Sequence, residues 1–265
     1  MAFFEEKNGA MVTMRSDVLR SHHGFTTRFG GVSEGEFASL NLGSSRGDDQ
    51  SRVGENYRRV CELAGVGGND AVVTCQVHGI EVRSVTAADK HAVGSRTPYE
   101  ADGIVTSEKN LPLMCFAADC IPVLLEDTQH GVIGAVHCGW RSSVGDILRV
   151  AVEKMCALGA KPGCISAALG PAIGACCFET DEDVVLAVKH YLGEKAAEGT
   201  FTQRADGKYL VDLREANRRR LVQLGVRAEQ IDVSEECTMC SHEKYWSHRY
   251  TRGRRGTQGA FIVLR

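Results

Sequence analysis

Residues 113–141 read LMCFAADCIPVLLEDTQHGVIGAVHCGWR and hold three apolar runs, Leu113–Ala118, Cys120–Leu125 and Gly131–Val136. Each run has the length and composition of a buried strand. The first two runs break at Asp119, and His137 directly follows the third. The stretch therefore predicts neighbouring strands that present Cys120 and His137 at their ends, where reactive side chains commonly lie.

Helix and strand signals interleave on both sides of this stretch. Upstream, apolar residues at helical spacing predict an amphipathic helix over Gly47–Ala64, and the run Ala71–Val77 predicts a strand that ends at His78. Downstream, a capping-box pattern at Ser143-x-x-Asp146 predicts a helix that continues to Leu158. The remaining predicted helices are Thr180–Leu192 and 213–224 after a cap at Asp212, and the remaining strands are Glu81–Val85, Gly103–Thr106, Cys164–Leu169, Lys208–Val211, Ile231–Val233 and Ala260–Leu264. This alternation predicts an α/β fold.

Two glycine- or polar-rich segments are predicted to be loops. Ser21–Gly43 contains three phenylalanines, so we expect an ordered loop region rather than a linker. Residues 88–101 are expected to form a surface loop in which His91 is solvated.

The length, charge and composition of the chain limit the kinds of function that it can have. With 265 residues, of which 43% are hydrophobic, the chain can bury a sizeable core as one large domain or two fused ones. A formal net charge of -3 gives no electrostatic reason to bind nucleic acid or a membrane surface, so a small ligand is expected. No secretory signal is evident, and no apolar run approaches the roughly 20 residues of a spanning helix. We therefore expect a cytoplasmic protein.

The eleven cysteines are an odd number in a long chain, which favours a reducing compartment over a disulfide framework. Cys61, Cys115, Cys156 and Cys164 lie in apolar settings and are predicted to be buried core residues. Cys237-x-x-Cys240 is the only CxxC pattern. Without a second CxxC it is a weak metal signal, and we interpret its two residues as ordinary thiols.

Cys120, His78 and His137 are side chains that can bind the same metal ion. A thiolate and two imidazoles can fill three of the four tetrahedral positions of zinc and leave one for water or substrate, as in catalytic sites. A metal-free alternative makes Cys120 a nucleophile that His137 activates as a base, for hydrolysis or deamidation. A copper oxidase of the multicopper type is disfavoured because the chain has no HxH pair, and a non-catalytic metal-binding role is the last alternative.

The sequence also lacks the common nucleotide and hydrolase motifs. There is no GxxxxGK[ST] phosphate loop, no GxGxxG after a strand and no GxSxG elbow. An arginine cluster, Arg249, Arg252, Arg254 and Arg255, could bind a phosphate, although such a run is more often a solvated surface.

Several motifs in fixed order resemble the YfiH-type laccase-domain family. They are Phe25–Ser33, Ser39–Gly43, Gln76–Gly79, Ala101–Gly103, Ala118–Val123, His137–Arg141, Gly170–Gly174 and Cys237-Thr238. They span nearly the whole chain. Small departures are Ser142 in place of the usual glycine, Cys138 beside the proposed site, and Ser247-His248-Arg249-Tyr250 in place of Ser-Tyr-Arg-Arg.

The resemblance implies a single α/β domain over residues 1–265 with four layers, α/β/β/α, and zinc held by His78, Cys120 and His137. It implies purine nucleoside phosphorylase activity on adenosine, inosine or S-methyl-5'-thioadenosine with phosphate, accompanied by adenosine deaminase activity. The fold is also similar to the catalytic domain of bacterial cytotoxic deamidase toxins, which keeps the metal-free cysteine–histidine alternative open.

On this basis we predict that Arg28 and Arg141 bind phosphate and that Asn41 and Asp119 orient polar groups of the nucleoside. The preferred purine and the oligomeric state stay open.

Overall fold

Strand β7 (Ile121–Asp127) sends alternate side chains into two different cores. Val123 and Leu125 belong to a core shared with helices, whereas Leu124 packs into a core that the strand shares with a second sheet. Strand β8 (Val132–Cys138) alternates in the same way, with Ile133 and Ala135 turned toward the second sheet. Period-two alternation with apolar residues on both faces is typical of a strand in the middle of a layered fold.

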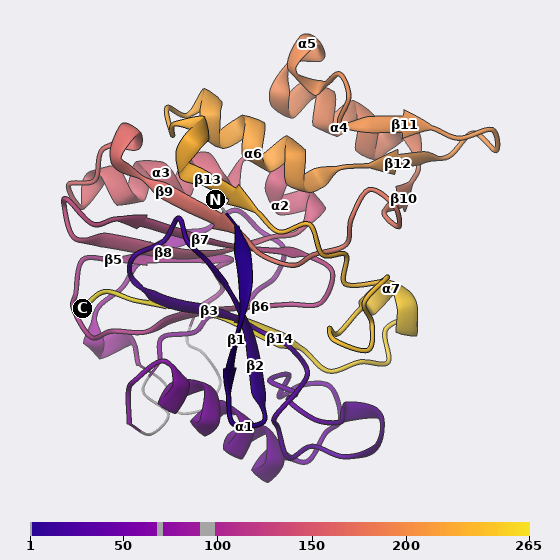
Figure 1. Ribbon diagram of the computed structural model, residues 1–265. Coiled ribbons are helices and arrows are strands. Elements are labelled where there is room, and N and C mark those ends of the chain that lie inside the picture. Colours follow the sequence, from indigo (N-terminus) through magenta and orange to yellow (C-terminus); the bar gives the residue numbers. More distant parts are fainter. Residues whose placement is uncertain (1, 68–70, 91–98) are drawn as a thin grey trace.

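The computed structural model describes residues 2–67, 71–90 and 99–265, and they form four layers (Figure 1). A six-stranded mixed sheet has the order β13-β9-β7-β8-β5-β4, and a five-stranded antiparallel sheet has the order β1-β2-β3-β14-β6. The other strands of the first sheet are β13 (Ile231–Val233), β9 (Ser166–Leu169), β5 (Gly103–Thr106) and β4 (Val82–Ser84); those of the second are β1 (Phe3–Asn8), β2 (Met11–Ser16), β3 (His22–Thr26), β14 (Gln258–Val263) and β6 (Leu113–Ala117).

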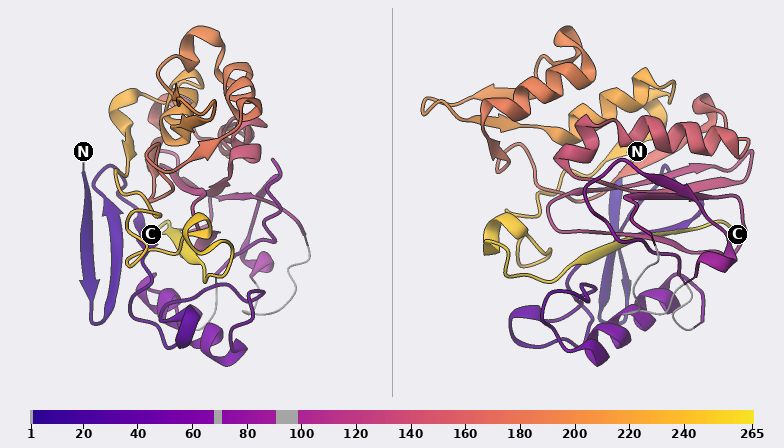
Figure 2. Two further views of the ribbon diagram at one scale, coloured as in Figure 1. Left: turned by 90° about the vertical axis from the view of Figure 1, so that its right-hand side faces the viewer. Right: turned by 180° about the vertical axis from the view of Figure 1, so that it is seen from behind.

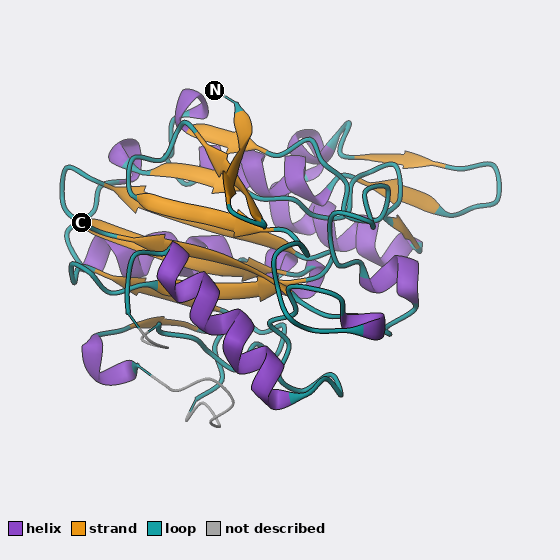
Figure 3. Cartoon of the chain, turned by 60° about the horizontal axis from the view of Figure 1, so that its bottom comes forward, coloured by secondary structure: helices purple, strands orange, loops and turns teal. Residues whose placement is uncertain are grey.

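Helices cover the outer face of each sheet. Helix α1 (Gln50–Leu63) crosses the five-stranded sheet, as Figure 3 shows, and its Tyr57 and Val60 share a core with Met114 and Phe261 of that sheet. On the opposite side lie α2 (Trp140–Val144), α3 (Ile147–Ala157), α4 (Glu182–Leu192) and α6 (Leu213–Gln223). The predicted four-layer α/β/β/α arrangement is therefore confirmed.

A small peripheral unit projects from the helical side (Figure 2). It contains the three-stranded antiparallel sheet β10-β12-β11, made of Glu179–Thr180, Tyr209–Val211 and Phe201–Gln203, and the short helix α5 (Glu194–Ala197). Helix α7 (His248–Thr251) lies near the end of the chain, before β14. None of the described helices combines the length and apolar character that crossing a bilayer requires.

Several predicted elements have different limits in the structure. The predicted strand Ala71–Val77 is wrong, because this segment makes only isolated bridges at Val72 and Cys75. The predicted loop Ser21–Gly43 contains β3, which pairs with β2 and β14. Most of the predicted loop 88–101, including His91, lies outside the described residues.

The capping box at Ser143-x-x-Asp146 is also wrong. Ser143 lies inside α2 and its hydroxyl accepts a hydrogen bond from Asn217, while Asp146 precedes α3 with a φ of 73° and binds Arg149 and Arg220. The cap at Asp212 is confirmed, since its carboxylate accepts the amide hydrogen of Glu215 at 3.0 Å. Cys61 and Cys115 are buried as predicted, but Cys156 and Cys164 are only half-buried.

Candidate metal centre and its cavity

His78, Cys120 and His137 come together in the fold. One nitrogen of each imidazole and the Cys120 sulfur all lie within 4.8 Å of one another. The pairing of β7 with β8 explains the meeting of two of them, because Ile121 lies opposite Cys138 and Pro122 opposite His137. Cys120 and His137 therefore lie at the same end of the hairpin, on the central sheet.

The local settings of these residues differ from the predicted strand ends. His137 lies within β8 rather than after it, and Cys120 directly precedes β7. His78 lies in a loop with a left-handed backbone, φ 60°, which is uncommon for a residue with a side chain. Exposure falls across the group, since His78 is exposed, Cys120 half-buried and His137 buried.

Asp102, which directly precedes β5, positions both histidines through hydrogen bonds. Its carboxylate accepts the backbone amide hydrogens of Val77, His78 and Gly79 at 3.0, 3.0 and 2.8 Å, which fixes the His78 loop. The same carboxylate accepts a hydrogen bond from Nδ1 of His137 at 2.8 Å. Nε2 of His137 is thereby left as the lone-pair nitrogen, the form in which histidine binds a metal.

Gly139 provides the room for these side chains. A Cβ atom at this position would come within 2.5 Å of Nδ1 of His78 and 3.4 Å of the Cys120 sulfur. Cys138, which the sequence places beside the site, points the other way into the core between the central sheet and the helices. Burial raises the pKa of the Cys138 thiol well above its usual value, so Cys138 is not a competing ligand.

The electrostatics favour a thiolate at Cys120. Burial by itself raises the pKa of this thiol, but the neighbouring imidazoles of His137 and His78 outweigh that effect and lower the pKa to about 6. Burial disfavours the charged form of His137, yet Cys120 and Asp102 raise its pKa above the usual value. The three residues thus provide two nitrogens and one anionic sulfur at a distance that suits one metal ion, which supports the fit of zinc.

A cavity of about 240 Å³ opens beside this group. One part of its lining is apolar or aromatic, formed by Trp140, Ile173, Phe178 and Leu213. Another part carries Arg46, Arg249 and Arg255, and His78, Ala118, Asp119, Cys120 and His248 complete the lining. A lining that combines apolar and aromatic side chains with arginines suits a ligand that joins a ring to an anionic group.

Arg255 is the most confined of the three arginines. It is 9% exposed, it donates hydrogen bonds to Gly256 O and Thr257 Oγ1, and its Nε has no hydrogen-bond partner. Burial lowers its pKa to about 10, and no described carboxylate forms an ion pair with it. A buried cation with an unpaired N–H at a cavity wall is a favourable place for an anion.

Arg28 and Asn41 are not among the residues that line this cavity. The Arg28 guanidinium donates to the carbonyls of Ala38 and His242 and stacks on Trp246 at 4.0 Å. Asn41 is fully buried and bonds Asp48, Gly43 and Thr257. Their hydrogen bonds hold loops together, and the structure places neither residue in the lining of this cavity, so the substrate contacts predicted for both stay predictions.

Asp119 and Arg141 lie closer to the predicted site. Asp119 lines the cavity, and its carboxylate accepts hydrogen bonds from Thr238 Oγ1 and from the backbone amide of Arg249, both at 2.6 Å. Arg141 is exposed and stacks on Trp140, a cavity residue, at 4.3 Å. Sequence reasoning gave no role to four residues of this region: Asp102, Arg46, Phe178 and His248. Asp102 does lie in the motif Ala101–Gly103. Two of the cavity arginines, Arg249 and Arg255, belong to the arginine cluster noted in the sequence.

The chain belongs to the laccase-like family whose model is described as "Multi-copper polyphenol oxidoreductase laccase", which matches residues 22–265. Among its relatives is the purine nucleoside phosphorylase YlmD of Geobacillus stearothermophilus, 36% identical over 252 residues, which cover 91% of this chain and 89% of the relative. A purine nucleoside phosphorylase of Deinococcus radiodurans is 37% identical over 253 residues, with 95% and 92% covered. The adenosine deaminase RL5 of an unknown prokaryotic organism is 34% identical over 220 residues, with 80% and 82% covered.

Solved structures agree with the fold. YlmD from Geobacillus stearothermophilus superposes with a TM-score of 0.92 at 34% identity and covers 100% of both chains. The hypothetical protein YfiH of Bacillus licheniformis superposes with a TM-score of 0.91 at 32% identity, covering 98% of this chain and 99% of its own. The predicted YfiH-like architecture is confirmed by these two structures.

Proposed function

We propose that the chain is a zinc-dependent purine nucleoside phosphorylase acting on adenosine, inosine and S-methyl-5'-thioadenosine, with adenosine deaminase activity at the same site. The observation that carries the proposal is a cavity whose lining contains His78 and Cys120 of the candidate metal group together with Arg46 and Arg255. The names of the relatives, which are purine nucleoside phosphorylases and one adenosine deaminase, support the same substrate class.

Phosphorolysis needs a place for phosphate and a place for the base. An oxygen of phosphate attacks C1' of the ribose, the bond from C1' to the purine nitrogen breaks, and its electron pair leaves with the base. We assign phosphate to Arg46 and Arg255, because a guanidinium binds phosphate through directed pairs of hydrogen bonds. We assign the purine to the wall of Trp140 and Phe178, since aromatic side chains stack on flat rings.

Two predicted residues keep roles in this scheme. Asp119 holds the segments that carry Thr238 and Arg249, and we assign to it the orientation of the cavity wall beside Cys120. Arg141 is exposed next to Trp140, where it can neutralise the outer end of a bound anion. Zinc bound by His78, Cys120 and His137 would act as a Lewis acid toward a substrate oxygen or lower the pKa of a bound water to about 7.

The first experiment incubates the purified, metal-analysed protein with adenosine, with and without phosphate, and separates the products by chromatography. Adenine and ribose-1-phosphate that appear only with phosphate support phosphorolysis. Inosine that appears with and without phosphate supports deamination. If inosine is the sole product, deamination is the only activity supported. No turnover of adenosine, nor of inosine or S-methyl-5'-thioadenosine with phosphate, would reject the nucleoside proposal and leave the cysteine–histidine hydrolase and a non-catalytic metal-binding role as the alternatives.

Arg255→Gln and Arg254→Gln form a matched pair of variants. Arg254 is an exposed neighbour that pairs with Glu36, so it controls for the loss of one charge. Loss of a charged hydrogen bond to phosphate costs about 1.5–3 kcal/mol, so Arg255→Gln should raise KM for phosphate about 10- to 100-fold. Deamination uses no phosphate and should persist in both variants, which also shows that they fold. Equal phosphate KM values in the two variants would remove Arg255 from the phosphate site.

The metal-free alternative rests on the order Cys120, His137, Asp102, in which a carboxylate orients the imidazole next to a thiol. The variant His137→Ala separates the two schemes. If His137 is a ligand, the variant should lose zinc and nucleoside turnover together. Retained zinc with lost turnover would make His137 a base, and full activity after complete removal of metal would favour the cysteine–histidine hydrolase.

A further inference from the structure

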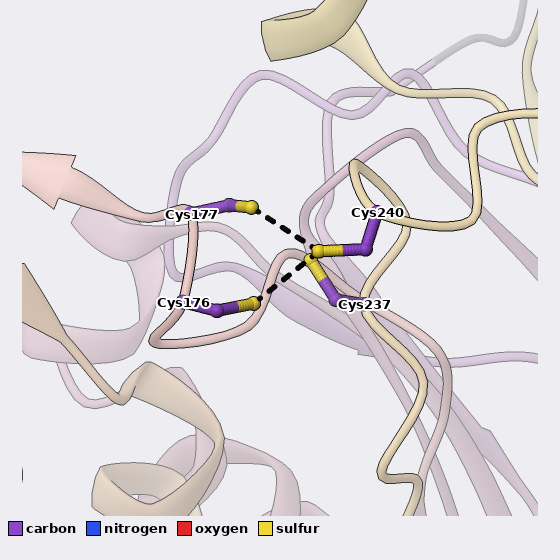
Figure 4. Close-up of side chains that lie close together, drawn as sticks. All are labelled: Cys176, Cys177, Cys237 and Cys240. Atoms are coloured by element: carbon purple, nitrogen blue, oxygen red, sulfur yellow. Dashed lines mark hydrogen bonds between the residues drawn. The ribbon is translucent and has the colours of Figure 1, made fainter.

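Four cysteines gather at a second place in the molecule (Figure 4). Cys176 and Cys177 come from the loop between β9 and β10, and Cys237 and Cys240 come from the segment after β13. All four sulfur atoms lie within 4.8 Å of one another. The Cys240 sulfur is 3.6 Å from that of Cys176 and 3.4 Å from that of Cys177.

These distances match a metal site rather than disulfides. Four sulfurs at about 2.3 Å from a tetrahedral zinc ion are about 3.8 Å from one another, whereas bonded sulfurs are about 2.05 Å apart. The cluster is also unlike a set of core thiols. Cys237 is buried, but Cys176 and Cys240 are exposed and Cys177 is half-buried, although free cysteine is usually among the most buried residue types.

The two loops are held together by backbone contacts around the sulfurs. Ala172 and Cys237 form a parallel bridge, and the amide of Thr238 donates to Ala172 O at 3.1 Å. The Gly174 amide donates to the Cys237 sulfur at 3.2 Å, a bond that stabilises a thiolate. The amides of Cys177 and Phe178 both donate to Gly174 O at 2.9 Å, which closes the turn that presents Cys176 and Cys177.

Gly174 lets the two loops approach each other. A Cβ atom there would lie 3.3 Å from the Cys176 sulfur and 3.3 Å from Cβ of Cys237. The same position is 2.8 Å from Nη2 of Arg214, so a guanidinium borders the cluster and can offset the negative charge of several thiolates. The arrangement is thus preorganised by contacts that do not depend on an ion.

We propose that Cys176, Cys177, Cys237 and Cys240 form a four-sulfur metal site that binds zinc in a structural role. All four tetrahedral positions are filled by protein sulfur, so no position is open for substrate. The site is separate from the His78, Cys120 and His137 group, and its existence does not depend on nucleoside chemistry. Cys176 and Cys177 are adjacent in the sequence and do not form a second CxxC pattern. The sequence spacing therefore does not identify them as partners of Cys237 and Cys240.

A metal ion here would fix one wall of the cavity. Thr238, between Cys237 and Cys240, donates its hydroxyl hydrogen to Asp119 at 2.6 Å, next to Cys120 in the chain. The Ile173 amide donates to Asp119 O at 2.9 Å, and Phe178 directly follows Cys177. Ile173 and Phe178 both line the cavity. Binding an ion between the two loops would therefore hold these cavity residues in place.

The test compares three variants of the full chain after zinc loading and removal of excess metal in reducing buffer. The variant His78→Ala/His137→Ala should keep one zinc ion per chain, and X-ray absorption should give four sulfurs at about 2.3 Å. The variant Cys176→Ser/Cys240→Ser replaces two exposed thiols and should lose that ion. It should keep metal at the other group if that group binds zinc. Cys156→Ser, a half-buried thiol on α3, is the control and should bind as much zinc as the wild type.

Three outcomes would overturn the proposal. The folded His78→Ala/His137→Ala variant could hold no zinc, its zinc could have a nitrogen ligand, or Cys176→Ser/Cys240→Ser could retain the four-sulfur spectrum. Folding is checked independently by circular dichroism. Chelation of the ion from the His78→Ala/His137→Ala variant should lower its melting temperature, because an ion that binds only the folded chain stabilises it. Because no nucleoside is used, failure of the proposed enzymatic function would leave this result unchanged.

Discussion

Asp102 is the residue that organises the candidate metal centre without being a ligand. Its one carboxylate fixes the His78 loop through three backbone amides and fixes the ring of His137 through Nδ1. Burial works against its charge, but the hydrogen bonds from His137 and from the loop amides prevail and lower the pKa of Asp102. It is a positioning residue, because it sets the direction of two imidazoles.

The substitution Asp102→Asn should weaken metal binding. The amide group replaces one acceptor oxygen by a donor, which would face backbone N–H groups of the His78 loop. Loss of such an outer hydrogen bond typically costs 10- to 100-fold in metal affinity, and we expect a decrease of about that size. Competition against a chromophoric chelator measures it.

Glu126→Gln is the matched control for this prediction. Glu126 is a buried carboxylate on β7 that accepts the amide hydrogens of Arg20 and Ser21, each at 2.7 Å. Its substitution should reduce stability without changing metal affinity. Equal affinities in the Asp102 and Glu126 variants would show that the carboxylate of Asp102 does not position the ligands.

At the scale of an element, β3 depends on an imidazole that must stay neutral. His23 accepts the backbone amide hydrogen of Ser16, at the end of β2, on Nε2 at 3.0 Å, and its Nδ1 lies 2.8 Å from Ser21 O. These partners require hydrogen on Nδ1 and a lone pair on Nε2. Burial is the main cause that lowers the pKa of His23 to about 4.

The folded state should therefore lose stability in mild acid. Between pH 6.5 and about 4 the unfolded chain binds a proton at this imidazole and the folded chain does not, so the free energy of unfolding falls as the pH falls. The difference between the pKa values of His23 in the unfolded and folded chains contributes about 3 kcal/mol to the pH dependence of the free energy of unfolding, and this stability is fully present above pH 6.5. Urea unfolding at a series of pH values measures it, and His23→Gln, which can accept from Ser16 but cannot titrate, should flatten the curve. An unchanged slope in that variant would contradict the prediction.

Sequence reasoning located most elements but misplaced the local settings of two proposed ligands, His78 and His137. Runs such as Gly103–Thr106 and Ile231–Val233 were predicted with correct limits because their apolar residues are buried by neighbouring strands. Ala71–Val77 has the same composition, but it lacks a continuous strand partner and makes two isolated bridges. Strand-like composition shows that a segment can pair and does not show whether a partner lies beside it.

The three proposed ligands of the candidate site could be selected from the sequence, whereas the contacts that position them could not. His78, Cys120 and His137 are chemically distinctive and meet as predicted. Arg28 resembles a phosphate-binding arginine in sequence, yet the fold commits its donors to backbone carbonyls. Asp102 contacts the His78 loop and His137, which are distant in sequence, and Arg255 shares the cavity lining with Cys120; spacing along the chain reveals neither arrangement.

For the whole molecule, the two large sheets join three cores into one structure: the central sheet borders two of them, and the five-stranded sheet borders the third. One face of the central sheet packs on α2, α3, α4 and α6, its other face packs on the five-stranded sheet, and that sheet packs on α1. Because successive residues of β7 and β8 belong to different cores, loss of one core removes the support of the next. We therefore predict that residues 1–265 unfold in one cooperative transition.

The two tryptophans allow this prediction to be tested on both sides of the molecule. Trp140 lies on α2 beside the cavity, whereas Trp246 is buried, 1% exposed, and donates to Leu40 O at 2.9 Å, near the side covered by α1. The variants Trp246→Phe and Trp140→Phe each leave one tryptophan as a local probe. In each variant, thermal unfolding followed by fluorescence should coincide with unfolding followed by far-ultraviolet circular dichroism, even if the substitution lowers the midpoint. A fluorescence midpoint that departs from the circular dichroism midpoint in either variant would show that one side unfolds separately, and residues 1–265 would then contain more than one domain.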